Sequence, residues 1–127
     1  MEIVINENLK FAAKSLGKAL LNSVPYKNFI NAREKFRNDE LAKKTEREYH
    51  SVVNNYQMKA KWGGITLEDE NKIEEAQKIA MGNKVLNDYY TSQEELIKFY
   101  QELNDYISEK LKFNFAGLAK PAGGCCG

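Results

Sequence analysis

The chain has 127 residues, of which 43% are hydrophobic and 29% charged, which is typical of a globular domain rather than a disordered segment. Its 19 Lys and Arg residues nearly balance 18 Asp and Glu residues, so no overall field favours a nucleic acid or an anionic membrane. No apolar run approaches the roughly 20 residues that span a bilayer, and the start of the chain lacks the basic region of a signal peptide. We therefore expect a cytoplasmic protein without membrane contact or a direct nucleic-acid partner.

Three amphipathic helices are predicted in the first half of the chain, after a short extended lead-in over residues 1–5. In each helix the apolar residues recur at spacings of three and four, which places them on one face. Asn6 is a favourable N-cap for the first helix, Pro25 suits the first turn of the second, and Asp39 can cap the third. Gly63 and Gly64 end the third helix because glycine disfavours helical backbone. The approximate bounds are 6–22, 25–36 and 39–61.

Two further helices are predicted over residues 66–83 and 84–113. Thr66 and Asp69 have the spacing of a capping box, with Asp in place of the usual Glu. The segment Met81-Gly82-Asn83 interrupts the apolar pattern and separates the two helices. A second cap signal at Thr91-Ser92-Gln93-Glu94 would either kink the last helix or mark its true start. The predicted fold is all-α: an antiparallel bundle of four to five helices over residues 1–114, with a long C-terminal helix.

The last helix is apolar over an unusually wide arc. Two neighbouring stripes run along it, and a helix of this kind usually has neighbours on two sides. In so small a protein the second neighbour can be another copy of the chain, so a homodimer is predicted. The residues expected at its interface are Leu96, Phe99, Tyr100, Leu103, Tyr106 and Ile107.

Residues 115–127 are predicted to form a flexible tail that ends in the chain's two cysteines, Cys125 and Cys126. Adjacent Cα atoms lie about 3.8 Å apart, whereas relaxed disulfides need roughly 4.4–6.8 Å. A bridge between these neighbours would be strained and easily reduced, so a structural disulfide is not expected. Free or metal-bound thiols agree with a reducing, cytoplasmic compartment.

The two thiols are the strongest candidates for chemistry, because a thiolate is both a nucleophile and a soft-metal ligand. They could contribute to an iron–sulfur or metal site, or they could pass a soft metal or a disulfide to another protein. Two thiols do not complete a site of four ligands, so a cluster would have to be shared with a second subunit or a partner. The alternative is an inert, dispensable tail on a plain helical interaction module.

Other residues offer little chemistry. His50, the only histidine, follows Glu46 by four residues, but a single pair of this kind is better explained as a helix-surface contact than as a metal site. The acidic residues 68–75 match the dipole of a helix start. The sequence contains neither a phosphate-binding glycine loop nor a Ser/His/Asp set, so we expect a protein that is not an enzyme.

Residues 66–113 carry a resemblance to a known family. The helix that opens with Thr66-Leu67-Glu68-Asp69-Glu70 is followed by Val85-Leu86-Asn87-Asp88-Tyr89-Tyr90 and then by Leu103-Asn104-Asp105-Tyr106-Ile107. This order resembles the YlbF/YmcA group of small helical bacterial proteins, and the helices of residues 7–60 fit the same group. The shared features are patterns of helix faces rather than catalytic signatures.

The resemblance implies an all-α dimeric regulator linked to competence, sporulation and biofilm control. Such proteins act in complexes with related family members and with a larger protein that holds iron–sulfur clusters and influences RNA processing by RNase Y. Only Cys125 and Cys126 match the cysteine-bearing tails found in the group. The two cysteines are adjacent here, whereas the better-known members of the group carry a longer, spaced set.

Overall fold

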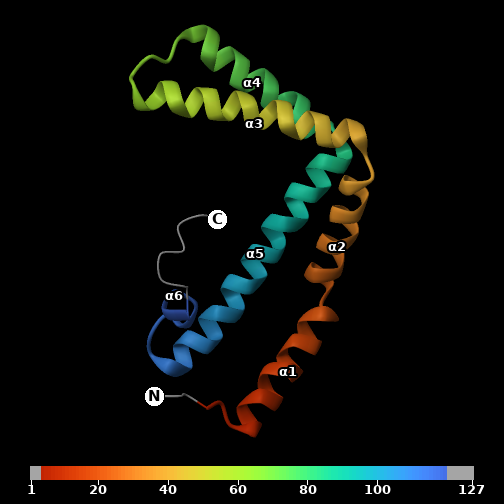
Figure 1. Ribbon diagram of the computed structural model, residues 1–127, viewed down its shortest axis with the longest axis vertical. Helices are drawn as coiled ribbons and strands as arrows, with labels where there is room; N and C mark the ends of the chain where they lie inside the picture. Colours follow the sequence, from red (N-terminus) through yellow and green to blue (C-terminus); the bar gives the residue numbers. More distant parts are fainter. Residues whose placement is uncertain (1–3, 120–127) are drawn as a thin grey trace.

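The computed structural model describes residues 4–119, which form six α-helices and no strand (Figure 1). This confirms the predicted all-α class. The helices are α1 (Glu7–Leu21), α2 (Val24–Arg37), α3 (Glu40–Lys61), α4 (Leu67–Gly82), α5 (Lys84–Leu111) and α6 (Phe115–Ala119). The bounds of the first five agree with the sequence prediction to within two residues, because local cap residues determine where each helix begins.

In α1, α3, α4 and α5 the N-cap is a short polar side chain that accepts a hydrogen bond from the first turn of the helix, whereas Ser23 before α2 makes no such bond. Asn6 Oδ1 accepts from the amide of Leu9 at 2.8 Å, and Asp39 Oδ1 accepts from the amide of Ala42 at 2.9 Å. Asn83, which the sequence marked only as an interruption, caps α5 in the same way. One residue therefore both ends α4 and starts α5.

The first packed unit is the antiparallel pair of α2 and α5 (Figure 1). Aromatic rings lie at its centre: the ring of Tyr89 stacks on that of Phe36 at a centroid distance of 4.7 Å and on that of Phe29 at 5.8 Å. The guanidinium of Arg33 lies 5.6 Å from the centroid of the Phe29 ring, within cation–π range. Stacked aromatic rings thus contribute to the contact between these two helices.

The second packed unit is the hairpin of α3 and α4, which meets the first pair near the start of α3. At this joint lie Ala42, Ala80 and Leu86, and the side chain of Leu86 is fully buried. Phe36 and Tyr49 pack around them. Among the described residues the only other buried hydrophobic residue is Leu96, so the helices form two pairs around a small joint rather than one compact bundle.

Helix α5 runs unbroken past the second cap signal, so the helix begins at Lys84 and is continuous through Thr91 and Ser92. Ser92 is buried, and its hydroxyl donates to the carbonyl of Tyr89 at 3.0 Å. This bond satisfies the hydroxyl inside the helix, so the residue does not end it.

A short helix, α6, is present where the sequence predicted the beginning of a flexible tether. Lys112 adopts a left-handed conformation, with φ of 67°, and turns the chain back at the end of α5. The side chains of Asn104 and Ser108 then accept hydrogen bonds from the amides of Ala116 and Phe115, both at 2.9 Å. These distant side-chain contacts, which local composition does not reveal, hold α6 against α5.

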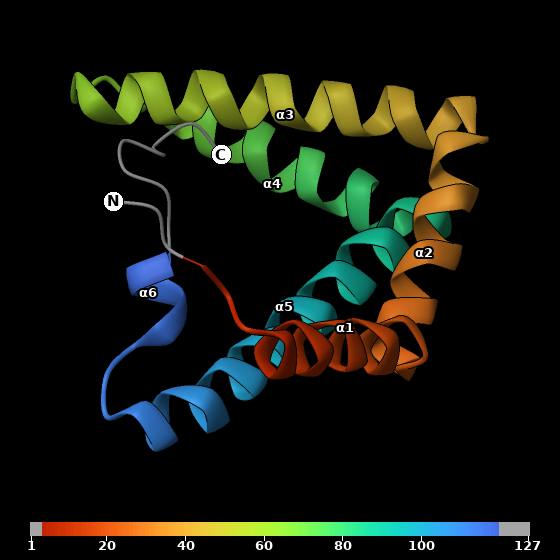
Figure 2. The same cartoon turned by 60° about the horizontal axis from the view of Figure 1, so that its bottom comes forward.

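Helix α1 extends away from the rest of the molecule. Among the described helices it contacts only α2, and none of its residues is buried. Figure 2 shows it crossing in front of α5, yet the two helices make no contact. None of the described helices is long and apolar enough to span a membrane.

Candidate interaction surface

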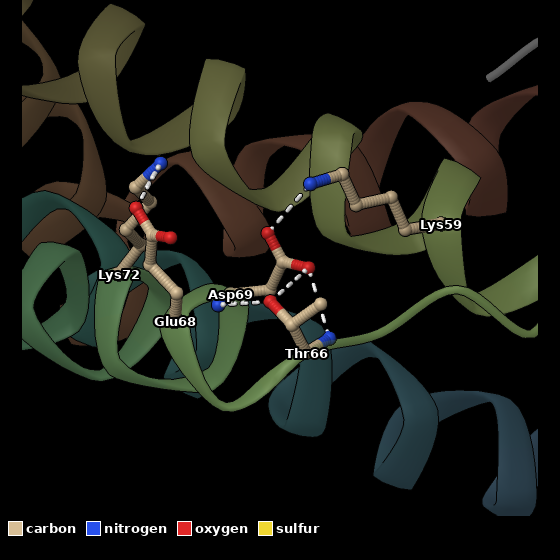
Figure 3. A network of polar contacts seen from close by, with 5 residues as sticks. All are labelled: Lys59, Thr66, Glu68, Asp69 and Lys72. Carbon is tan, nitrogen blue, oxygen red and sulfur yellow. Dashed lines mark hydrogen bonds and ion pairs between the residues drawn. The ribbon is translucent and has the colours of Figure 1, made fainter.

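A polar network joins the two helices of the α3–α4 hairpin next to the loop that connects them (Figure 3). Lys59 Nζ of α3 lies 2.7 Å from Asp69 Oδ1 of α4. The other carboxylate oxygen of Asp69 accepts from the amide and the hydroxyl of Thr66 at 3.0 and 2.9 Å, and the Asp69 amide donates to the Thr66 hydroxyl, which completes the predicted capping box. The hydrogen bond from Lys59, followed by those from Thr66, lowers the pKa of Asp69 to about 2.

A groove runs between the two helices that this network joins. A cavity of about 370 Å³ lies between α3 and α4, with Tyr49 and Val52 on one side and Ala76 and Ile79 on the other. A second cavity, of about 270 Å³, shares Val52 and Lys72 with the first and reaches Met58. The two cavities form one apolar groove along the hairpin, called the hairpin groove below. The sequence did not indicate this groove, because a groove between two helices has no local sequence signal.

The six predicted interface residues all lie on α5, but they differ in exposure. Leu96 is only 8% exposed, so the chain itself already covers it. Phe99, Leu103 and Ile107 are half-buried. Tyr100 is exposed, and Tyr106, at 68%, is the most exposed of the set. The part of the predicted face that is available to a partner therefore lies toward the C-terminal end of α5.

Other exposed apolar residues, which are not among the six predicted interface residues, lie next to this surface and at the opposite end of the molecule. Leu111, Phe113, Phe115 and Leu118 surround a depression of about 290 Å³ where α6 folds back on α5. At the other end of the molecule Trp62, the only tryptophan, is 85% exposed where α3 ends. Exposed aromatic residues of this kind often anchor protein interfaces.

The total accessible surface is larger than that expected of a compact monomer of this mass. The chain exposes 10436 Å², whereas a folded monomer of 14.6 kDa is expected to expose about 6,900 Å². The residues outside the described range would contribute at most about 1,500 Å² even if fully extended. The remaining excess, on the order of 2,000 Å², exceeds the roughly 800 Å² that each partner buries in a standard interface.

Cys125 and Cys126 lie outside the described residues, as does most of the predicted tail. Among residues 4–119, no three His, Cys, Asp or Glu side chains are grouped so that they could hold a metal ion. His50 Nε2 lies 3.2 Å from Glu46 Oε1 on the surface of α3, in the predicted helix-surface pair. The described part of the chain thus offers surfaces for binding rather than a grouped set of metal ligands.

The fold and these surfaces define a small all-α protein with large uncovered apolar faces. The sequence profile of the family described as control of competence regulator ComK, YlbF/YmcA, matches residues 11–112, which span the greater part of α1 and all of α2 to α5. The chain belongs to the YlbF/YmcA family, as the helix patterns of residues 66–113 had indicated. No curated protein matches the chain.

Proposed function

We propose that the protein is a non-enzymatic, cytoplasmic regulator that acts as an adaptor in complexes with other proteins. Membership of a family of competence regulators supports the regulatory role. The observation that supports the adaptor role is the total accessible surface, which exceeds that expected of a compact monomer by more than a standard interface buries per partner and includes exposed apolar side chains. Its partners would be a second copy of the chain, related family members and a larger cluster-holding protein.

The C-terminal end of α5 would supply part of the homodimer interface. Tyr106 tests this, because its side chain is mostly exposed and a substitution there leaves the packing within one chain intact. We expect Tyr106→Glu to give the mass of a single chain by light scattering at micromolar concentration, where the unchanged protein gives twice that mass. Gln101→Glu, which adds the same charge at an exposed polar position of α5, is the matched control and should leave the mass unchanged.

Cys125 and Cys126 would contribute two thiolates to an iron–sulfur or metal site shared with another chain. Two cysteines supply half of the usual four ligands, and residues 4–119 contain no cysteine and no group of three or more His, Asp or Glu side chains that could hold a metal ion. A cluster held by one copy alone therefore does not fit this chain. The role of the helical body would be to bind the partner and bring the two thiols to its ligands.

Anaerobic purification with iron and sulfide analysis and a visible spectrum tests the shared site. The protein should be colourless when expressed alone and should carry iron and sulfide when co-expressed with a related family member and the cluster-holding protein. Replacing both cysteines by serine should remove the iron while the proteins still purify together. A metal-free, colourless complex would contradict the proposal for the tail.

Metal binding and partner binding also distinguish the two alternative roles of the tail, a soft-metal or redox relay and a dispensable extension. A soft-metal or redox relay should bind a thiophilic ion tightly as a lone subunit, because adjacent thiols can hold such an ion without a partner. A plain interaction module should bind its partners equally well after residues 120–127 are deleted, and metal content should not depend on these residues.

A further inference from the structure

Helix α1 carries an apolar face with no partner in the described part of the chain. Leu9, Ala13, Leu16 and Leu20 share that face, and none of the four is buried. An isolated helix of about 15 residues is marginally stable in water, and Gly17 weakens it further. The face therefore needs a surface to cover it, and the hairpin groove offers an apolar surface of matching size.

The dimensions of α1 and the groove agree. Helix α1 has 15 residues, so it is about 22 Å long at 1.5 Å per residue. The α3 wall of the groove extends from Thr45 to Lys59, a rise of about 21 Å. The groove floor is apolar, with Ile79 56% exposed on it, which suits the binding of an amphipathic helix by its apolar face.

The charges of α1 and the groove are opposite. Three lysines and one glutamate give α1 a net positive charge. Four carboxylates and two lysines line the groove and give it a net negative charge: Glu48, Glu68, Asp69 and Glu75 against Lys59 and Lys72. Opposite net charges on two binding partners favour their encounter.

Helix α1 does not reach this groove in its own chain. It joins the end of α2 that is remote from the hairpin, and Figure 1 places α1 and the hairpin at opposite ends of the molecule. The 14 residues of α2 separate them by about 21 Å. The α1 that fits the groove therefore comes from another chain.

We propose that α1 of one copy lies in the hairpin groove of a second copy, and that the second copy returns the same contact. Each chain then gives one arm and one groove, as the two-fold symmetry of a homodimer requires. The uncovered area per chain is sufficient for this exchange and for the contact at the end of α5. The inference rests on the proposed homodimer and specifies a second, reciprocal part of its interface.

Two substitutions test the exchange by light scattering. Leu16→Glu on the arm and Ile79→Glu on the groove each place a carboxylate in the proposed apolar contact. Each should weaken the dimer by about a hundredfold or more, because a buried, unpaired charge is costly. Ser15→Glu and Gln77→Glu carry the same added charge at exposed neighbouring positions and should leave the dimer intact.

Mixing the two variants tests reciprocity. In a mixed dimer the Leu16→Glu chain still has its groove, and the Ile79→Glu chain still has its arm, so one contact is whole. Differently tagged variants should therefore purify together more readily than either variant associates with itself. Disulfide cross-linking tests whether Leu16 of one chain lies beside Ile79 of the other. In chains that carry Cys125→Ser and Cys126→Ser, a Leu16→Cys protein should cross-link to an Ile79→Cys protein on oxidation. A Ser15→Cys protein should not cross-link to it.

The outcomes separate this inference from the homodimer itself. If Leu16→Glu and Ile79→Glu leave the dimer intact while Tyr106→Glu dissociates it, the exchange is wrong and the homodimer stands. If the unchanged protein is monomeric at all concentrations, the homodimer and the exchange both fail. A monomer that binds a different protein through Ile79 would also overturn the exchange, because the groove would then serve that protein.

Discussion

Asp69 shows how one side chain connects two helices. Its carboxylate accepts hydrogen bonds from Thr66 at the start of its own helix and pairs with Lys59 of α3, although the side chain is almost wholly covered. These partners favour the charged form, which is why its pKa falls to about 2. A carboxyl group with a lowered pKa stabilises the folded state above the pKa of the unfolded chain, and that stabilisation is lost as pH falls toward 2.

Asp69→Asn should lower the free energy of unfolding at pH 7, because the amide loses the ion pair with Lys59. The difference between the two proteins should shrink as pH falls from about 4 to about 2, since the Asp69 of the unchanged protein becomes protonated over that range. Urea unfolding at a series of pH values measures this. Asp105→Asn, at an exposed position on α5, should show no comparable narrowing.

Tyr90, unlike Asp69, is a polar side chain without a hydrogen-bond partner among the described residues. Its hydroxyl oxygen is buried, and burial raises its pKa to about 12. A buried polar group without a partner costs about 1–3 kcal/mol. Tyr90→Phe should therefore leave the free energy of unfolding unchanged or raise it, as measured by urea unfolding at pH 7. A clear loss of stability would mean that the hydroxyl has a partner in solution.

At the scale of elements, the helices differ in how strongly the rest of the chain holds them. Helices α2 and α5 are held by stacked rings, and α3 and α4 by the Asp69 network. Helix α6 depends on two side chains of α5, Asn104 and Ser108. Helix α1 touches only the neighbouring α2, so its folding depends more than that of any other long helix on what binds it.

Removal of residues 1–21 should therefore leave the remaining helices folded. Circular dichroism should show only the loss of the signal from α1, with cooperative thermal unfolding retained. The Tm of the full chain should rise with protein concentration, because association stabilises the folded state, and this dependence should weaken in the shortened chain. Loss of cooperative unfolding after the deletion would show that α1 supports the rest of the fold within one chain.

At the scale of the whole molecule, a small joint positions every surface described above. Leu86 is fully buried where the two helix pairs meet, and it packs with Ala42 and Ala80. Few other apolar side chains are buried among the described residues, so few other contacts would stabilise the fold if the packing at the joint were weakened. The angle between the pairs, and with it the distance between arm and groove, depends on this contact.

Leu86→Ala should cost about 2–5 kcal/mol, because it leaves a cavity that the surrounding helices do not fill. This is a large fraction of the stability of a typical domain. Leu67→Ala removes the same group at a position that is 73% exposed and should change stability little. The difference between the two variants in the free energy of unfolding, measured with urea, gives the contribution of Leu86 to stability. Equal losses of stability in the two variants would contradict the role of Leu86 at the joint.

The sequence by itself determined the all-α class and the bounds of five helices, because caps such as Asn6 and the Thr66–Asp69 box and the apolar periodicity act over a few residues. The family also followed from these patterns. The sequence did not reveal α6 or the hairpin groove, because both depend on contacts between side chains that are distant in the chain. Only the tertiary structure showed that Leu96 is already covered within the chain and that α1 has no cover. Periodicity shows that a helix has an apolar face, but only packing shows whether its own chain covers that face.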